Sequence, residues 1–359
     1  MKKETKRFVL NPEQMGSAEA QDALDRAAAL LRTGGLVALP TETVYGLGAN
    51  ALDENAVERI FIAKQRPSWD PIIVHVAPLA DPLEMLEGLI EPLAEDAPAR
   101  RLIEAFWPGP LTLLLPRTAN VPDSVTAGRP LVGVRMPAHP VALELIRRAG
   151  VPVAAPSANL FGHISPTTAE HVLADLDGRI DAVVDAGPTG YGVESTVLDP
   201  CSRPMIIYRP GAVTAEQIRE VAGEVELFKE SGVSAAARAE PLPSPGVGLR
   251  HYAPRARLVV VEAPEAELGA RLAAAVLMRT DDYVGVMLPK GVIAPIDMAA
   301  AKIIEWGSWD APEEMARTLY ACLRTLDAEG CSVIVCPMPP QGGIGTALRD
   351  RLQKAARAK

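Results

Sequence analysis

The chain has few of the residues that would indicate a metal centre or a disulfide framework. Its 359 residues include four cysteines and five histidines. The cysteines form no CxxC pair and no Cys/His metal spacing, and the histidines show no HExxH spacing. We therefore expect thiols in a reducing compartment and no catalytic zinc held by protein ligands.

Long apolar runs are also absent. No stretch approaches the roughly 20 continuous apolar residues of a membrane span, and no apolar run of signal-peptide length follows the basic residues near the N-terminus. The formal net charge of −9 argues against a protein that coats nucleic acid without sequence preference. We predict a cytoplasmic protein with no membrane association and no strong direct binding to nucleic acid.

Two sequence motifs of catalysis are missing. There is no Walker A motif, so an ATP site here would not use that phosphate loop. The nearest glycine motif, GGIGTAL at residues 342–348, lacks the third glycine and the later acidic residue of a dinucleotide site, and we interpret it as a tight loop opening the last helix. Ser195, in GVESTVLD, lacks the GxSxG context of a nucleophile, which favours a hydrogen-bonding or turn role.

Apolar periodicity instead predicts two α/β regions, in agreement with the ~100 to 200 residues of a typical domain. In the first region we expect strands at residues 36–40, 111–115, 131–135, 151–156, 182–187, 195–199 and 204–209. Helices are expected near residues 17–32, 53–64, 92–106, 140–149 and 167–176.

The pattern changes after residue 227, where small residues, prolines and glycines predict an extended linker. Beyond it, helices near residues 265–278, 312–328 and 345–357 alternate with apolar strands. We predict an α/β fold with a twisted mixed sheet in a catalytic domain at 1–227, a linker at 228–256, and a smaller doubly wound, Rossmann-like domain at 257–359.

Residues 36–76 bring many polar side chains to the ends of expected elements. An apolar strand, a hydroxyl-rich loop, a helix and a second strand carry Thr41, Glu42, Thr43, Lys64, Arg66 and His75. Binding groups commonly lie on loops of a rigid α/β scaffold. The block therefore predicts a site for a small, polar, anionic ligand.

Three cations in or near this block each allow two interpretations. Lys64 and Arg66 end a helix, where they can complement its dipole or bind a polyphosphate, which a guanidinium holds in a bidentate fork. Arg135 ends the apolar run VGVRMP, where an unpaired buried charge is costly. It needs an acidic partner in the protein or the carboxylate of a ligand, and its position favours neither.

The loop at residues 155–168 carries Ser157, Asn159 and Ser165 before an expected helix. Ser165 or Thr167 can act as the N-cap of that helix. Helix N-termini also favour anions, so a phosphate contact is the alternative. Further along, YRPGAV presents Arg209 at a strand edge.

Eight motifs, in the correct order, resemble the threonylcarbamoyl-AMP synthase family, also called the YrdC type. They are PTETVYGLGANA, AKQRPSWDPIIVHV, WPGPLTLLL, VGVRMP, PSANLFGHISPT, ESTV, RPGAV and SPGVGLRHYAP. The linker and the C-terminal region resemble the longer, two-domain form of the family. The resemblance implies condensation of L-threonine, bicarbonate and ATP into threonylcarbamoyl-adenylate, with release of pyrophosphate, for the threonylcarbamoyladenosine modification of tRNA.

The resemblance also implies site residues, with no covalent catalyst and no metal ligand among them. Those expected to hold L-threonine are Thr43, His75, Arg135 and Ser195, with Arg135 on the carboxylate. Those expected to hold ATP are Lys64, Arg66, Ser157, Ser165, Arg209 and, from the linker, Tyr252. Mg²⁺ would accompany ATP, no tightly bound cofactor is expected, and the implied partners are downstream proteins of tRNA threonylcarbamoyl transfer.

Two positions depart from the family pattern. Asp70 stands where Asn is frequent, so its carboxylate can contact ribose or Mg²⁺ instead, and Leu131 stands where Thr is common and offers no side-chain hydrogen bond. A rival function is a module of the same fold that binds double-stranded RNA or the ribosome, against which the net charge argues. Another is carbamoyl transfer in hydrogenase maturation, whose zinc-finger and acylphosphatase segments are absent from the sequence.

Overall fold

The computed structural model describes residues 4–78, 83–229, 244, 252–279, 282–297 and 301–357. The chain divides into two compact units. The first comprises Met1–Phe161, Pro166–Gly190 and Glu194–Gly248, and the second Gly162–Ser165, Tyr191–Val193 and Leu249–Lys359. Of the predicted linker, residues 230–243 and 245–251 lie outside the described residues, so its path and the predicted domain boundaries stay predictions.

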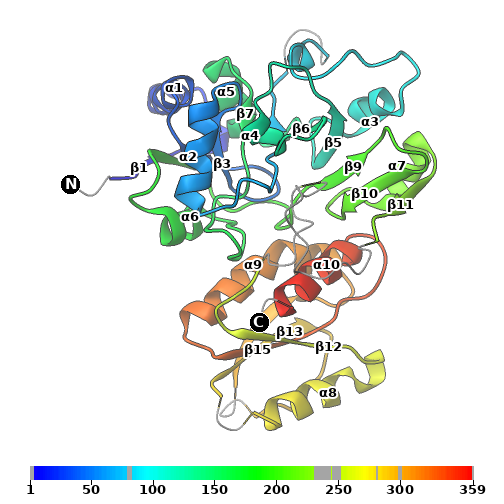
Figure 1. The fold of residues 1–359 in the computed structure, drawn as a ribbon. Coiled ribbons are helices and arrows are strands. Elements are labelled where there is room, and N and C mark those ends of the chain that lie inside the picture. The colour runs from blue at the N-terminus through cyan, green and yellow to red at the C-terminus, as the bar shows by residue number, and fades with distance from the viewer. Residues whose placement is uncertain are drawn as a thin grey trace. The chain divides into compact units, whose positions relative to one another are not determined.

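The first unit contains a mixed sheet in the order β1-β8-β2-β3-β7-β4-β6-β5-β9-β10-β11. Its strands β9, β10 and β11 lie side by side in green in Figure 1. Its strands are β1 (Lys6–Val9), β2 (Val37–Leu39), β3 (Gly46–Asn50), β4 (Val74–His75), β5 (Leu111–Pro116), β6 (Leu131–Arg135), β7 (Val153–Ala154), β8 (Ala182–Asp185), β9 (Thr196–Asp199), β10 (Met205–Arg209) and β11 (Val225–Leu227). The sheet contains parallel pairs, such as β4 with β6, and antiparallel pairs, such as β5 with β6. This confirms the predicted mixed sheet.

The helices of the first unit join these strands. They are α1 (Ala18–Arg32), α2 (Glu54–Lys64), α3 (Pro98–Phe106), α4 (Asp123–Thr126), α5 (Pro140–Ala149), α6 (Ala169–Leu176) and α7 (Ala215–Ala222), with 3-10 turns η1 (Pro12–Gln14) and η2 (Glu84–Leu86). Side-chain caps fix several starts: the Ser17 hydroxyl accepts from the Ala20 amide, and the Asp53 carboxylate accepts from the Ala56 amide.

Apolar cores cover both faces of this sheet. Along β2, Val37 and Leu39 pack in one core with α1 and α5, whereas Ala38 packs in the other core with α2 and α6. Alternate residues of a strand point to opposite faces, so a strand that is apolar throughout is buried on both sides. The polar groups of this unit therefore gather at strand ends and in loops.

The sequence analysis missed or misplaced some elements of the first unit. Strand β3 contains two glycines and has little strand propensity. A Cβ at Gly48 would come within 2.8 Å of the Leu39 and Val153 side chains. The absence of a side chain at Gly48 therefore allows these neighbours to pack closely on the strand. Helix α3 begins at Pro98, not near residue 92. Helix α7 was not predicted, although its capping box between Thr214 and Gln217 is a readable start signal.

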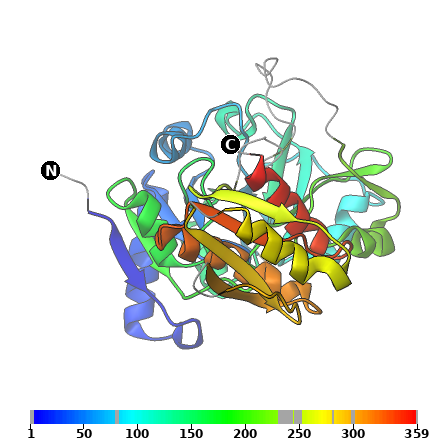
Figure 2. The same ribbon diagram turned by 90° about the horizontal axis from the view of Figure 1, so that it is seen from below.

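The second unit is a parallel sheet in the order β12-β15-β13-β14. Its elements are β12 (Arg257–Val261), α8 (Glu265–Leu277), β13 (Val284–Lys290), β14 (Lys302–Ser308), α9 (Pro312–Ala328), β15 (Val333–Pro337) and α10 (Gly345–Ala356). Within this unit α9 and α10 lie on one face of the strands and α8 on the other, and α8 is nearest to the viewer in Figure 2. The predicted doubly wound α/β arrangement is confirmed.

The motif GGIGTAL forms the loop that opens α10, as interpreted from the sequence. Gly342 and Gly343 have positive φ angles of 90° and 51°, which L side chains rarely adopt. A Cβ at Gly345 would overlap the carbonyl oxygen of Pro340. Turn geometry and close packing thus account for these glycines.

Candidate functional site

Two predicted threonine ligands lie on neighbouring strands. His75 of β4 is in register with Arg135 of the parallel strand β6 and with Val153 of the antiparallel strand β7. Both His75 and Arg135 are buried. Burial lowers the pKa of His75 to about 3, and the Arg135 charge acts in the same direction, so the imidazole is neutral near pH 7.

The Arg135 guanidinium is held from three sides. Its Nε donates to the carbonyl oxygen of Gly109 (3.1 Å), and its Nη1 donates to Thr43 Oγ1 (2.9 Å). Its Nη2 lies 2.5 Å from Glu42 Oε1, an ion-pair distance without the angles of a hydrogen bond. The buried arginine thus has an acidic partner in the protein, and N–H groups on Nη1 and Nη2 stay uncommitted among the described contacts.

Hydrogen bonds to Thr41 fix the position of Thr43. Thr41 Oγ1 donates to the carbonyl oxygen of Val44 (2.6 Å), accepts from the Thr43 amide (3.2 Å) and lies 2.8 Å from Thr43 Oγ1. These local bonds fold the hydroxyl-rich loop between β2 and β3 into a compact turn. The loop therefore presents Glu42 and Thr43 together to Arg135.

Ser195 and Arg209 form a second buried polar group. Arg209 Nε donates to the carbonyl oxygen of Ser195 (3.1 Å), and its Nη2 donates to Ser195 Oγ (3.0 Å). Ser195 Oγ also lies 2.8 Å from Thr112 Oγ1. This agrees with the hydrogen-bonding role expected for Ser195. Thr112 had not been singled out, although a single hydroxyl inside the apolar run LTLLL was an available signal.

Lys64 is the last residue of α2, but its ammonium group donates to carbonyl oxygens outside that helix. Its Nζ donates to the carbonyl oxygens of Ser157 and Asn159, which fixes the loop at residues 155–168, here called the serine loop, against α2. Burial lowers the pKa of Lys64 well below its usual value, and the Arg66 charge adds to this effect. An anionic ligand would favour the charged ammonium.

Arg66 pairs with Asp70, the position that departs from the family pattern. Arg66 Nη2 lies 2.9 Å from Asp70 Oδ1 and donates to the carbonyl oxygen of Pro71 (2.8 Å). Burial raises the pKa of the Asp70 carboxyl, and the charges of Arg66 and Lys64 oppose this rise. The carboxylate is thus held inside the protein by the cation predicted to bind phosphate.

Of the two remaining predicted ligands, Ser165 is buried, but the N-cap of α6 is Thr168, so neither Ser165 nor Thr167 caps this helix. Tyr252 belongs to the second unit. Its ring stacks on Tyr320 with centroids 5.9 Å apart, and the Arg351 guanidinium lies 4.9 Å from its centroid. Tyr252 also has a positive φ of 65°, which is uncommon for a tyrosine.

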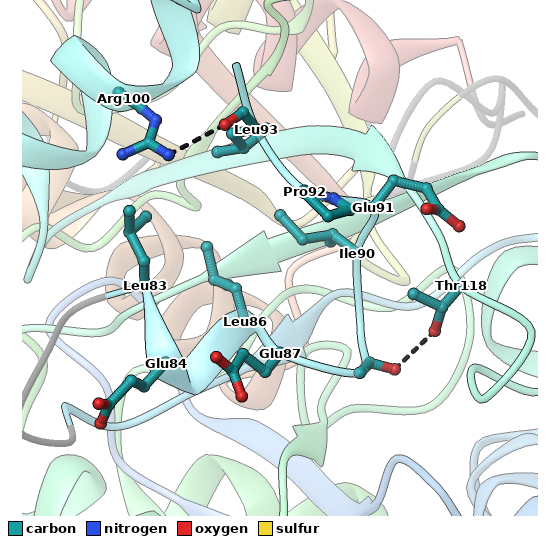
Figure 3. A pocket seen from close by; sticks show the side chains of 11 residues that line it. Leu83, Glu84, Leu86, Glu87, Ile90, Glu91, Pro92, Leu93, Arg100 and Thr118 are labelled. Carbon is teal, nitrogen blue, oxygen red and sulfur yellow. Dashed lines mark hydrogen bonds between the residues drawn. The ribbon is translucent and has the colours of Figure 1, made fainter. Parts of the chain in front are cut away.

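A cavity of about 500 Å³ lies elsewhere in the first unit (Figure 3). Its lining includes Leu86, Ile90 and Leu93 with three glutamates, and none of the predicted site residues takes part. The Arg100 guanidinium is already bonded to the carbonyls of Leu93 and Ala94. Volume alone does not identify a site, and we assign the chemistry to the buried cluster around Arg135 and Ser195.

In the part of the chain that the structure describes, no group of three or more His, Cys, Asp or Glu side chains could hold a metal ion. None of the described helices is long and apolar enough to cross a membrane.

Comparison with known proteins decides the family. A family model described as "Telomere recombination", for Sua5, YciO and YrdC proteins, matches residues 29–211, and a model described as "Threonylcarbamoyl-AMP synthase, C-terminal domain" matches residues 213–357. The chain is 43% identical to the threonylcarbamoyl-AMP synthase of Pyrococcus abyssi over 92% of this chain and 93% of that protein. The chain belongs to the threonylcarbamoyl-AMP synthase family.

Other relatives agree with this assignment. The Bacillus subtilis threonylcarbamoyl-AMP synthase is 43% identical over 98% of both chains. A crystal structure of P. abyssi Sua5 complexed with L-threonine superposes with a TM-score of 0.86 at 40% identity, covering 99% of this chain and 98% of that one. The family predicted from the motifs and the α/β fold class are confirmed.

Proposed function

We propose that the protein is an L-threonylcarbamoyladenylate synthase, which condenses L-threonine, bicarbonate and ATP into threonylcarbamoyl-AMP and pyrophosphate. The observation that carries this proposal is the buried Arg135, fixed by Gly109 and Thr43 with N–H groups left for a ligand. A relative with 40% identity has been solved with L-threonine bound, and the curated relatives bear the name of this activity.

On the threonine side, Arg135 binds the substrate carboxylate by charge-assisted hydrogen bonds. Thr43, His75 and Ser195 supply the other contacts. The neutral imidazole of His75 can donate one hydrogen bond and accept another. The register of His75 with Arg135 and the bond of Arg135 to Thr43 support the grouping of these three residues.

On the nucleotide side, Lys64, Arg66, Ser157 and Arg209 of the first unit hold ATP, and Ser165 and Tyr252 stay expectations from the resemblance. The bond of Lys64 to the carbonyl oxygen of Ser157 supports the grouping of these two residues. The bond of Arg209 to Ser195 supports a link between the nucleotide side and the threonine side. Mg²⁺ enters with ATP, because this hard cation takes its ligands from phosphate oxygens and water. No tightly bound cofactor is required.

The chemistry needs placement more than covalent catalysis. The ammonium group of threonine gives a proton to solvent, and the free amine forms a carbamate with bicarbonate as water leaves. One carbamate oxygen then attacks the α-phosphorus of ATP, and the bond from that phosphorus to pyrophosphate breaks. Fixed cations and oriented reactants supply most of such a rate enhancement. The buried guanidinium groups of Arg135 and Arg209 provide fixed charge of this kind.

We further propose that the product serves tRNA modification in the cytoplasm and passes to the proteins of threonylcarbamoyl transfer. The RNA-binding alternative is not favoured, because nearly full-length relatives bear the name of an enzyme. The match of the C-terminal family model also disfavours the hydrogenase-maturation alternative.

The test is release of pyrophosphate from ATP and bicarbonate with L-threonine, with L-serine or with no amino acid. We expect release that depends on both bicarbonate and L-threonine, with L-serine a poorer substrate. Mass spectrometry of the product provides the second readout. Release without an amino acid, or none with any, would reject the proposed function.

A further inference from the structure

Glu42 is a partly buried acid to which no role in ligand binding has been assigned. Both carboxylate oxygens are inaccessible to solvent, and neither has a hydrogen-bond partner among the described residues. Among the described residues, the carboxylate forms one ion pair, the 2.5 Å approach of Oε1 to Arg135 Nη2. A buried carboxylate without hydrogen bonds costs considerable free energy, so such a group calls for an explanation.

Neutralisation of Arg135 is an incomplete explanation. A carboxylate serving only that purpose would accept a bidentate fork from the guanidinium, which is the strong geometry for this pair. Instead Arg135 directs Nε to Gly109 and Nη1 to Thr43, and Glu42 meets Nη2 at an angle that makes no hydrogen bond. The geometry leaves acceptor capacity on Glu42 and donor capacity on Arg135, side by side.

An α-amino acid matches this arrangement. Its carboxylate and ammonium groups sit on one carbon, so a site for it needs a cation and an anion a few ångströms apart. The protein places Arg135 at the end of β6 and Glu42 in the loop before β3 in that relation. If the substrate carboxylate binds Arg135, a neighbouring Glu42 would repel it unless the substrate ammonium lies between them.

We propose that Glu42 binds the α-ammonium group of L-threonine and so selects an α-amino acid over a simple hydroxy acid. This inference rests on the proposed function and adds a residue to it. Charge-assisted hydrogen bonds from the ammonium satisfy the carboxylate oxygens when the substrate is bound. The same contact directs the nitrogen that forms the carbamate.

The test compares two ligands that differ only in the amino group. (R)-3-Hydroxybutanoate has the carboxylate, the hydroxyl and the methyl group of L-threonine but no ammonium. Calorimetric binding of each ligand is measured for the wild-type protein and for Glu42→Gln. We expect Glu42→Gln to weaken L-threonine binding by about 10- to 100-fold, and to leave hydroxybutanoate binding unchanged or stronger.

A structural role for Glu42 gives a different result. If its purpose is only to hold Arg135, Glu42→Gln weakens both ligands by the same factor, and the proposal is overturned. Unchanged binding of both ligands also overturns it. Glu170→Gln, which removes the charge of an exposed glutamate paired with Arg7, is the matched control and should alter neither ligand.

Two measurements keep the test decisive. If Glu42→Gln does not fold, the wild-type protein alone must still prefer L-threonine to hydroxybutanoate by about 10-fold or more, and equal affinities reject the role of Glu42. Pyrophosphate release by the wild-type protein separates the two proposals. If pyrophosphate release depends on L-threonine but Glu42→Gln changes the binding of both ligands equally, only the inference about Glu42 is rejected.

Discussion

Both units contain buried arginines, but their partners differ. In the first unit, the guanidinium groups of Arg135 and Arg209 bond to backbone carbonyls and hydroxyls. In the second unit, Arg351 lies between the ring of Tyr252 and the carboxylate of Asp350. The arginines of the first unit belong to two polar groups, one of Arg135 with Thr43 and Glu42 and one of Arg209 with Ser195. Arg351 belongs to an aromatic stack. Burial of an arginine therefore does not by itself indicate a site, and the partners of the guanidinium separate the two cases.

The acids show the same difference. The carboxylate of Glu42 is inaccessible beside Arg135 and has no hydrogen bond among the described residues, while Asp350 is bonded to Lys354 on its own helix (3.1 Å). An unsatisfied buried group costs stability and is retained where a ligand satisfies it. The comparison predicts that charge changes in the first unit affect catalysis most, and that changes in the second unit affect folding.

The largest expected effect comes from Arg135→Ala. It removes the proposed carboxylate contact and leaves Glu42 buried beside no cation, which costs about 3 to 5 kcal/mol. We expect kcat/KM for L-threonine to fall by about 100- to 1,000-fold and urea unfolding to shift to lower concentration. Kinetics within a few-fold of wild type in a folded protein would contradict the assignment.

Acid should weaken the first unit through His75. Its folded-state pKa of about 3 lies below the usual 6.5, so the unfolded chain binds this proton first as the pH falls. Stability present above pH 6.5 is thus lost as the pH falls toward 3, by up to about 1.4 kcal/mol per pH unit. The free energy of unfolding, measured with urea between about pH 7 and pH 5, should fall less steeply with falling pH for His75→Asn than for the wild-type protein.

Trp306→Phe tests the second unit. The Trp306 indole is fully buried and donates to the carbonyl oxygen of Met315 (2.8 Å). Loss of this bond and of ring volume should destabilise the unit by about 1 to 3 kcal/mol. The KM for L-threonine should stay at the wild-type value at temperatures well below unfolding. A raised KM with unchanged stability would contradict the division of roles.

The smallest effect is expected at the exposed pair of Arg271 and Glu267 on α8. Their side chains are 66% and 56% exposed, and solvent screens such pairs. Arg271→Gln should change the free energy of unfolding by less than about 0.5 kcal/mol, with no change in kinetics. A larger loss in thermal and urea unfolding would show that exposed charges matter more here than we propose.

The sequence predicted the long, strongly periodic elements well. The helices at α1, α5, α9 and α10 and the strands at β5 and β6 lie where apolar spacing indicated, because their periods are unambiguous. Strand β3 was missed because its glycines are selected by contacts with Leu39 and Val153, which are distant in sequence. Such tertiary packing leaves no local signal.

The candidate site divides in the same way. The residue types at the ends of strands, together with the motif order, were sufficient to name the family and to single out Thr43, Lys64, Arg66, His75 and Arg135. Only the tertiary structure decided how these groups are used: Lys64 is bonded to the serine loop, Arg66 to Asp70, and Arg135 to both Thr43 and Glu42. Hydrogen bonding and burial depend on side chains far apart in the chain, so the sequence determined which chemistry was available and the fold decided where each charge is held.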